Sequence, residues 1–484
     1  MATDLNRILK FDRSQLSTFS RDIKERFKDK DWSTIGLTTA IFIFLVSFAV
    51  LVRILFAYYY REAFTVDSDP IVWNRNVDFF PNGAIFAGFA DFRYYYKIWV
   101  DGWYNQGWYP FLDWHEAIDG DALDLYSYPP IFLYFLVLIW RPGMNDLWLA
   151  LPMIIADAAC AGMVYLIIKK IFKDEKNTFL AFIGGFVMAL SPINIIYDGV
   201  FWLNPGPVTL FTLISFYFLL NRKWRQTFFW LALATMTKQN ALFFTYPLFF
   251  IMLGEKVREK GTKRGSFESI MNALFFVLVC LFISIPWIFI TPIFYGAHML
   301  FPGQMLRLDS NIKDPDFNHT VQFSWSLKEI GVNQAFLDFI AYTSNSMLLM
   351  IVSASVIAVP LLWRSFKVKL DNSEIFEVLA VYTIITHIFM PRGVYKFYSA
   401  YYMPIIIVAL IGSLGYYGKH WLTKSTFLTI GISLFFAFSF WHLIIPREFT
   451  PLILFLASVV IAFLAGIRGT FKHLEKRYQF NLKW

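Results

Sequence analysis

Charged residues are scarce in this sequence. Only 16% of the 484 residues are Asp, Glu, Lys or Arg, 57% are hydrophobic, and the mean hydropathy is +0.51. In a soluble domain about a quarter of the residues are charged. Windows of about 20 apolar residues recur along the chain, each long enough to cross a bilayer as a helix. Backbone polar groups inside lipid must be paired within their own segment, so the sequence predicts an all-α, polytopic integral membrane protein.

Cysteine is nearly absent too. Cys160 and Cys280 both lie in apolar runs, where we interpret them as buried apolar side chains. Two such residues exclude a disulfide framework and a cysteine-rich metal cluster. The sequence also shows no Gly-rich phosphate loop, no internal repeat and no secretory signal.

Positive charge is in modest excess, with a formal net charge of +8 and a sequence pI of about 9.1. The basic residues gather in short connectors and at the two ends of the chain, as cytoplasmic orientation and anionic lipid require. We therefore expect a membrane as partner and no nucleic acid.

The charge pattern also predicts the organisation of the chain. Residues 1–33 read as a cytoplasmic amphipathic segment, 34–467 as the transmembrane domain and 468–484 as a basic cytoplasmic tail. Within the transmembrane domain, 61–129 holds eleven acidic and four basic residues and is predicted to be an outer loop. A second outer loop is expected at 293–335.

Apolar runs predict about 11–13 spans, the first at 34–58. One run, 126–141, is short and starts at Pro129-Pro130, so it is expected to be a partial or tilted helix. Another, 226–253, is interrupted by Lys238-Gln239-Asn240, which favours two short helices meeting at a polar turn. The further runs are 146–168, 178–198, 205–221, 269–292, 337–363, 374–391, 395–417, 423–443 and 450–467.

Asp91 is the leading candidate for chemistry. It lies in an aromatic-rich segment just before a long apolar run, and in a helix Tyr94 and Tyr95 would share its face. A carboxylate in that position can accept the proton of an attacking sugar hydroxyl. Trp99 and Trp103 follow and could line a sugar-binding groove. The alternative is that Asp91 is one of many acidic residues on a wet loop.

Polar residues inside apolar runs are the next candidates. Asp157 lies within a span, where ionisable side chains usually face a cavity or a partner, although a structural hydrogen bond between helices is equally plausible. In the Lys238-Gln239-Asn240 tripeptide, the lysine could bind a phosphate, or the tripeptide could be an interfacial loop. Arg392 and Lys396, amid aromatic residues, and Arg307 are further candidate phosphate partners, or ordinary interfacial anchors.

Over about residues 50–405, these pieces in this order resemble the C-type glycosyltransferase superfamily. The likeness is to dolichyl-phosphate-glucose glucosyltransferases and to archaeal and bacterial membrane mannosyltransferases. The motifs that carry it are Asp91-Phe92 with Trp99, Trp108-Tyr109, Tyr128-Pro129-Pro130, Ile155-Ala156-Asp157, Ser191-Pro192, Asp198-Gly199-Val200-Phe201, Lys238-Gln239-Asn240 with Pro247, His298-Met299-Leu300-Phe301-Pro302 with Arg307, and Lys396.

The resemblance implies a hexosyltransferase that moves mannose or glucose from a polyprenyl-phosphate donor to a lipid-linked glycan, glycolipid or protein acceptor. It implies an inverting, metal-independent reaction without cofactors, at the non-cytoplasmic face of a plasma or endoplasmic reticulum membrane. Asp91 would be the base. Lys396, Arg392, Arg307 and Lys238 would hold the donor phosphate, and the acceptor would be lined by Tyr94, Tyr95, Trp99, Trp103, Asp157, Asp198, Gln239 and Asn240.

This sequence departs from the superfamily at two places. Leu203-Asn204-Pro205 stands where relatives carry a polar cluster, and Tyr395 stands before Lys396 where relatives often have histidine. The Trp-Trp-Asp signature of the metal-dependent oligosaccharyltransferases is missing. A transporter or lipid-linked-sugar flippase is the alternative function, and a non-catalytic assembly subunit is a third.

Overall fold

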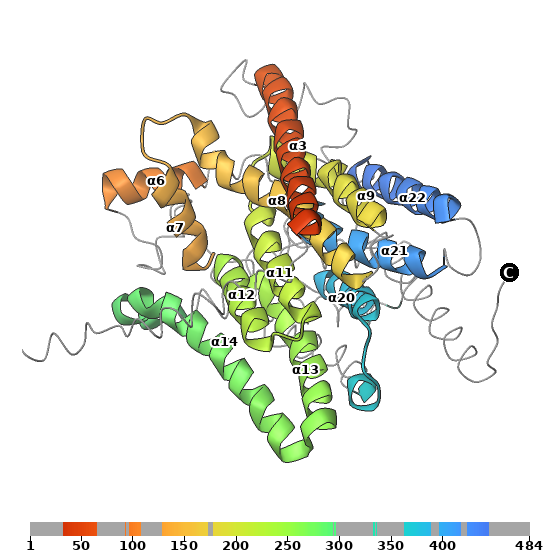
Figure 1. Cartoon of the computed structure of the whole chain (residues 1–484). Coiled ribbons are helices and arrows are strands. Elements are labelled where there is room, and N and C mark those ends of the chain that lie inside the picture. Colours follow the sequence, from red (N-terminus) through yellow and green to blue (C-terminus); the bar gives the residue numbers. More distant parts are fainter. Residues whose placement is uncertain are drawn as a thin grey trace, which may run out of the picture. The chain divides into compact units, whose positions relative to one another are not determined.

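The structure is a computed structural model of the whole chain (Figure 1). It describes residues 32–64, 92, 96–107, 128–172, 178–293, 295–296, 333, 335, 363–388, 396–417 and 424–444. The terminal segments 1–31 and 445–484 lie outside these residues, as do the centres of both predicted outer loops. The predicted domain boundaries therefore stay predictions.

Regular structure in the described residues is helical throughout. Within the described ranges, four stretches are long and apolar enough to cross a membrane, Ile35–Tyr58, Asp146–Ile171, Thr178–Val200 and Thr262–Ile290. The predicted all-α, polytopic membrane fold is confirmed. The elements are α3 (Trp32–Phe64), α6 (Lys97–Asp101), η3 (Gly102–Gln106), α7 (Pro130–Ile139), α8 (Asp146–Ile171), α9 (Thr178–Ala189), α10 (Pro192–Asn194), η7 (Ile195–Val200), α11 (Pro205–Leu220), α12 (Trp224–Thr237), η8 (Gln239–Phe244), α13 (Thr245–Lys260), α14 (Thr262–Ile290), α20 (Asn372–Ile388), η9 (Lys396–Tyr401), α21 (Met403–Tyr417) and α22 (Lys424–Ile444).

The chain divides into two compact units, Met1–Phe44 and Leu45–Trp484. Of the first unit, the structure describes only the beginning of α3. In the second unit, α11 packs against α8 and α12, α8 packs against α9, and α20, α21 and α22 pack in sequence. Helices α8 and α11 therefore form the centre of this unit.

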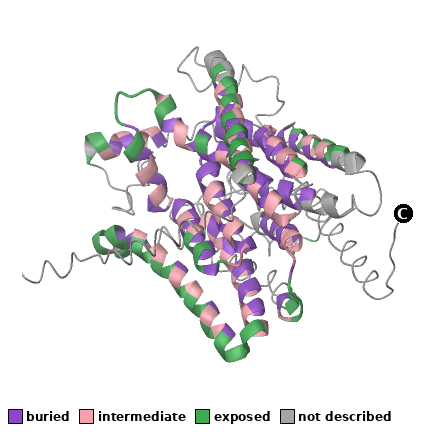
Figure 2. Ribbon diagram, viewed as in Figure 1, coloured by how far each residue is buried: buried purple, intermediate pink, exposed green. Residues whose placement is uncertain are grey.

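Burial separates central helices from peripheral ones. In the most apolar window of α8, 72% of the residues are buried, against 17% in that of α14 (Figure 2). The exposed side chains of α14 are large and apolar, and include Phe267, Leu278, Phe282 and Phe289. An apolar exposed face is what contact with lipid acyl chains requires.

Helix α7 confirms the expectation of a short helix in the run 126–141. It begins at Pro130, directly after Pro129, whose extended backbone suits the position before a helix. With ten residues it is about 15 Å long, half of the hydrocarbon thickness of a bilayer. Helix α7 therefore does not cross the membrane alone.

The polar tripeptide also interrupts its apolar run as predicted. Helix α12 ends at Thr237, Lys238 is extended, and a 3-10 turn (η8) leads into α13. The Lys238 side chain lies in the interior of the second unit, where the residue is 3% exposed.

Part of the first predicted outer loop is packed into an aromatic cluster. Phe92, Tyr96 and Trp99 are buried there with Phe132 of α7 and Trp202 of the turn before α11. The Phe92 and Trp202 rings meet edge to face, with centroids 4.9 Å apart. Such pairs stabilise by about 0.5–1.5 kcal/mol beyond their burial.

Candidate functional site

Six Asp, Glu, Lys or Arg side chains are buried among the described residues, and two of them, Glu255 and Glu377, lie apart from the groups considered next. The other four are in the interior of the second unit. Arg53 and Asp157 are 0% exposed, as is Asp198, and Lys238 is 3% exposed. They come from α3, α8, η7 and the α12–η8 junction. A buried charge is costly unless it is paired, and in a membrane protein it marks a functional or structural polar centre.

The first polar group centres on Asp157. Arg53 Nε donates to Asp157 Oδ2 at 2.5 Å, and Asn194 Nδ2 donates to Asp157 Oδ1 at 2.9 Å. Arg53 Nη1 also donates to the carbonyls of Ala49 and Ala189, and Ser191 donates to Asn194 Oδ1. Both carboxylate oxygens are thus engaged, and the group ties α3, α8 and α10 together.

Asp198 forms a second group, at the entry of α11. It lies in a π-helical turn, a feature that often marks functional sites. Its Oδ1 accepts the backbone N–H of Gly206 at 2.8 Å, near the N-terminus of α11, where a carboxylate is favoured. Its Oδ2 has no hydrogen-bond partner among the described residues.

The chain between Asp198 and α11 is strained. Trp202 has φ = 59°, which is unusual for a bulky residue. This conformation places the Trp202 ring in the aromatic cluster and Asn204 in the interior, where Asn204 is 1% exposed.

Lys238 lies in a cage of tyrosine rings. Its Nζ is 4.9 Å from the ring centroid of Tyr128, 4.6 Å from that of Tyr398 and 5.1 Å from that of Tyr401. It donates a hydrogen bond to Asn204 Oδ1 at 3.1 Å. Ring faces attract an ammonium ion by about 0.5–2 kcal/mol each, so the cage holds the charge in place.

Tyr401 completes this third group. Its hydroxyl donates to Asn204 Oδ1 at 2.8 Å, so one amide oxygen accepts both the ammonium and the phenol. The amide nitrogen of Asn204 has no hydrogen-bond partner in the part of the chain that the structure describes. We call Lys238, Asn204 and Tyr401 the lysine group.

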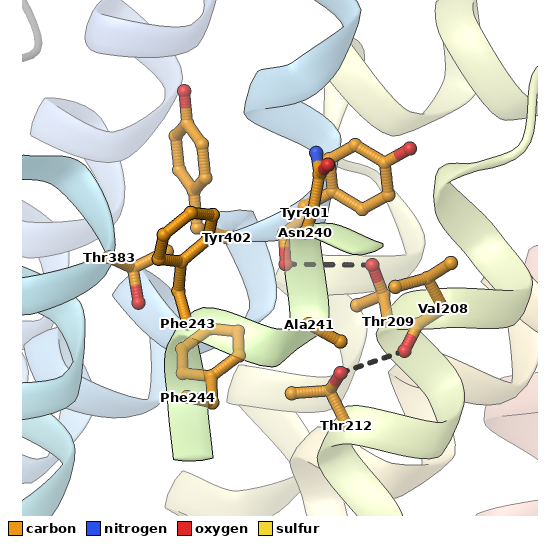
Figure 3. Close-up of a pocket in the computed structure, with 10 residues that line it drawn as sticks. All are labelled: Val208, Thr209, Thr212, Asn240, Ala241, Phe243, Phe244, Thr383, Tyr401 and Tyr402. Atoms are coloured by element: carbon orange, nitrogen blue, oxygen red, sulfur yellow. Dashed lines mark hydrogen bonds between the residues drawn. The ribbon is translucent and has the colours of Figure 1, made fainter. Parts of the chain in front are cut away.

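A small cavity adjoins the lysine group (Figure 3). Its volume is about 30 Å³, enough for one or two water molecules. Tyr401 lines it together with Asn240, and Thr209 donates to the backbone carbonyl of Tyr401 across it at 3.5 Å. The other lining residues are Val208, Thr212, Ala241, Phe243, Phe244, Thr383 and Tyr402.

Several predicted site residues lie outside the described residues, among them Asp91, the predicted base. Tyr94, Tyr95, Arg307 and Arg392 are outside them too. Lys396 begins η9, but its side chain is not described. The predicted roles of these residues remain predictions.

The described site residues fall into two places. Lys238, Asp157 and Asp198 belong to the buried polar interior, and Asn240 lines the cavity next to it. Gln239 is half-buried in η8. Trp99 is 2% exposed and Trp103 packs against the same aromatic cluster, so both contact other rings of the protein.

Sequence reasoning missed three residues of this interior. Arg53 is an arginine inside the first span, and a charged residue in an apolar run is itself a signal of a buried partner. Asn194 and Tyr401 carry no comparable signal. An amide or a phenol in an apolar sequence is common, and only the fold brings them beside Asp157 and Lys238.

Two titratable groups outside the membrane-spanning stretches have shifted pKa values, Asp101 and Tyr295. Burial raises the pKa of Asp101 on α6, Lys97 lowers it, and Asp146 raises it. Lys97 Nζ pairs with Asp146 Oδ1 at 3.0 Å, with both side chains more than a third exposed.

Burial also raises the pKa of Tyr295 to about 12, although its hydrogen bond with Ser284 acts in the opposite direction.

Groups of three or more His, Cys, Asp or Glu side chains that could hold a metal ion are not found among the described residues. The expectation of a metal-independent protein without cofactors stays a prediction, because the undescribed segments contain further acidic residues.

Residues 119–307 match the family model of the GPI transamidase subunit PIG-U. The match covers less than half of the chain. It contains Asp157, Asp198, Asn204 and Lys238, whereas Arg53 and Tyr401 lie outside it. No curated protein and no solved structure matches the chain.

This similarity corrects the prediction of enzymatic activity. The sequence motifs favoured a hexosyltransferase that uses a polyprenyl-phosphate sugar, and that prediction is wrong. The matching family is a subunit of a transamidase, which joins a protein to GPI and does not transfer a hexose. What stands is a multi-pass integral membrane protein with a similarity to a GPI-anchoring component.

Proposed function

We propose that this chain is a membrane subunit of a GPI transamidase type of complex, in which it holds the lipid substrate and catalyses no transfer itself. GPI is glycosylphosphatidylinositol, a phospholipid that carries a glycan. The observation that carries the proposal is the match of residues 119–307 to the PIG-U subunit family. A non-catalytic assembly subunit is the third function that the sequence left open.

The position of the match supports this role. The matched segment runs from just before α7 to just beyond α14, so it includes the turn with Asp198 and the lysine at position 238. The likeness is therefore to the part of the chain that builds the polar interior. A polar centre inside a membrane protein suits the head of a lipid-linked glycan.

The exposed apolar surface of helix α14 supports the same role. Helix α14 exposes large apolar side chains and closes the matched segment. The apolar surface provides contact with acyl chains, while the polar interior provides contact with a head group. A subunit with both can hold an amphiphilic substrate at the bilayer boundary.

Depletion of the chain in its own cells tests the proposal. We expect GPI-anchored proteins to disappear from the cell surface and their unprocessed precursors to accumulate, while the complete GPI lipid accumulates as well. The precursors are followed by immunoblotting and the lipid by mass spectrometry. Re-expression of the parent chain should restore both.

The same experiment separates the proposal from its competitors. A lipid that accumulates with a missing sugar would contradict the transamidase role, because synthesis of the glycan would then have stopped. Normal processing of the precursors in depleted cells would contradict it as well. A complete lipid trapped on the cytoplasmic side would favour the flippase.

A further inference from the structure

We propose that Lys238 and Asn204, positioned by Tyr401, form a binding site for the phosphate group of an anionic lipid. The inference deepens the proposed function and rests on it for the lipid as the source of the phosphate. The chemistry itself is argued from the described side chains.

The ammonium group of Lys238 is fixed in position. A lysine side chain ordinarily moves among many rotamers, and ordering it has a conformational-entropy cost. Here three tyrosine rings and the hydrogen bond to Asn204 already order it. A ligand that meets this charge has little ordering cost to offset, so binding is favoured.

Asn204 supplies a second donor beside the charge. Its side chain is 99% buried, and its Nδ2 has no hydrogen-bond partner among the described residues. Lys238 and Tyr401 both donate hydrogen bonds to Oδ1, so the orientation of the amide group is fixed and its nitrogen, Nδ2, is the atom left without an acceptor in the described part of the chain. A buried N–H without an acceptor destabilises the folded state, and a ligand oxygen that accepts its hydrogen bond removes that cost.

The two donors together select an anion with several acceptor oxygens. A phosphate monoester or diester offers oxygens to an ammonium and an amide at the same time. Lysine binds phosphate as a point charge, which suits the single ammonium of this site. A neutral sugar hydroxyl could satisfy the amide but would gain little from the charge.

The cage has an inner and an outer side. Lys238, Asn204 and Tyr401 are buried, whereas Tyr128 and Tyr398 are half-buried. Tyr128 directly precedes Pro129 at the start of α7, and Tyr398 lies in η9. A ligand would therefore reach the ammonium past these two rings, whose faces can pack against the inositol or sugar ring that follows the phosphate.

Lipid binding by the purified full-length chain tests the site. The protein is placed in nanodiscs of phosphatidylcholine alone or with phosphatidylinositol, and the retained lipids are quantified by mass spectrometry. We expect phosphatidylinositol to be enriched by the parent chain. Lys238→Gln should weaken this enrichment by about tenfold, the size of one charge-assisted hydrogen bond.

A second variant keeps the test independent of folding. Asn204→Asp has the same shape but replaces the amide donor with a carboxylate that pairs with Lys238, so it should repel phosphate and retain the fold. Lys367→Gln is the matched control, because its ammonium lies 4.3 Å from the ring centroid of Trp363 outside the site. Circular dichroism and gel filtration verify that each variant is folded.

Inorganic phosphate distinguishes the two sources of the ligand. If millimolar inorganic phosphate reduces the retention of phosphatidylinositol, the result supports a site that binds the phosphate group. Retention of phosphatidylinositol at the parent level in both folded variants would overturn the proposal. Enrichment of inorganic phosphate with no preference for phosphatidylinositol would overturn the lipid as its source. These binding measurements use the purified chain without other subunits. A failure of the phosphate site can therefore be distinguished from a failure of the proposed function in the transamidase complex.

Discussion

The Asp157 group and the lysine group are both buried and polar, yet their hydrogen bonds are distributed differently. Asp157 has both oxygens engaged, by Arg53 and by Asn194, while the second terminal nitrogen of Arg53, Nη2, has no hydrogen-bond partner among the described residues. Asn204 has its oxygen engaged twice, while its nitrogen has no partner in the part of the chain that the structure describes. The open donor of the first group belongs to a guanidinium that a carboxylate already neutralises. The open amide of Asn204 lies beside an ammonium that neutral rings and an amide hold in place, which suits an anionic ligand.

The two groups also join different parts of the chain. The Asp157 group connects α3, α8 and α10 through side chains and the carbonyls of Ala49 and Ala189. The lysine group connects the turn before α11, the α12–η8 junction and η9. The comparison predicts that substitutions in the first group affect folding, and substitutions in the second affect binding.

The largest expected effect is that of Asp157→Ala. It leaves the Arg53 guanidinium buried without its carboxylate, which costs about 3–5 kcal/mol in the free energy of unfolding. The variant should fail to give a monodisperse peak in gel filtration, or should unfold at a much lower temperature in detergent. The double variant Arg53→Met with Asp157→Leu should recover most of that stability, because no unpaired charge remains.

A surface ion pair serves as the control for this prediction. Lys97 and Asp146 pair at 3.0 Å but are 37% and 38% exposed. Loss of an exposed pair costs about 0–1 kcal/mol. An Asp146→Asn variant that loses as much stability as Asp157→Ala would show that burial does not decide the difference between the pairs.

Gly206→Ala should have the next largest effect. A Cβ at this position would lie 2.7 Å from the Met153 carbonyl oxygen and 2.8 Å from the Asp157 backbone nitrogen. These atoms are backbone, so α8 and α11 would have to separate, at about 1–3 kcal/mol. Thermal unfolding in detergent measures the loss. Gly36→Ala, with nothing within 4 Å, should be at least as stable as the parent.

Tyr401→Phe should have a moderate effect and Tyr398→Phe a smaller one. Both substitutions keep the ring near Lys238, but only the first removes a hydroxyl bonded to Asn204. Loss of that bond should cost about 1 kcal/mol and weaken phosphatidylinositol retention. Equal lipid retention by the two variants, with both folded, would show that the Asn204 amide is not fixed by Tyr401.

Asp101→Asn should have the smallest effect, and it depends on pH. Burial raises the pKa of Asp101, so the folded state disfavours its charge. At neutral pH the neutral asparagine should raise the free energy of unfolding slightly, by about a few tenths of a kcal/mol, because the side chain is largely solvated. Thermal unfolding in detergent at several pH values measures the difference. Below pH 3 aspartate is protonated in both states, and the difference should vanish. A difference that grows as the pH falls would contradict this sign.

Much of the fold could be predicted from the sequence. Apolar runs gave the positions of α8, α11 and α14, because burial in lipid imposes a length and composition on each segment. Pro129-Pro130 and Lys238 marked a short helix and a helix break, since each changes what the backbone can do locally. Each of these features is determined by residues that are close together in the sequence, so it can be predicted without knowing the fold.

The site could be predicted only in part. Asp157 and Lys238 stand out as charges in apolar sequence, but their partners Asn194 and Tyr401 are brought to them by packing of distant helices. The same charges suited a hexosyltransferase as well as a subunit without transferase activity, and motif order alone favoured the hexosyltransferase, which the family match contradicts. Residue types limit the chemistry that a site can perform, but they do not identify the complex in which it works.

Purification of the tagged chain from its own membranes in mild detergent tests the central claim most directly. We expect the other subunits of a GPI transamidase to co-purify in fixed proportion, and the purified complex to join a precursor protein to GPI. A chain that purifies without them, from membranes in which those subunits are intact and associated with one another, would contradict the account.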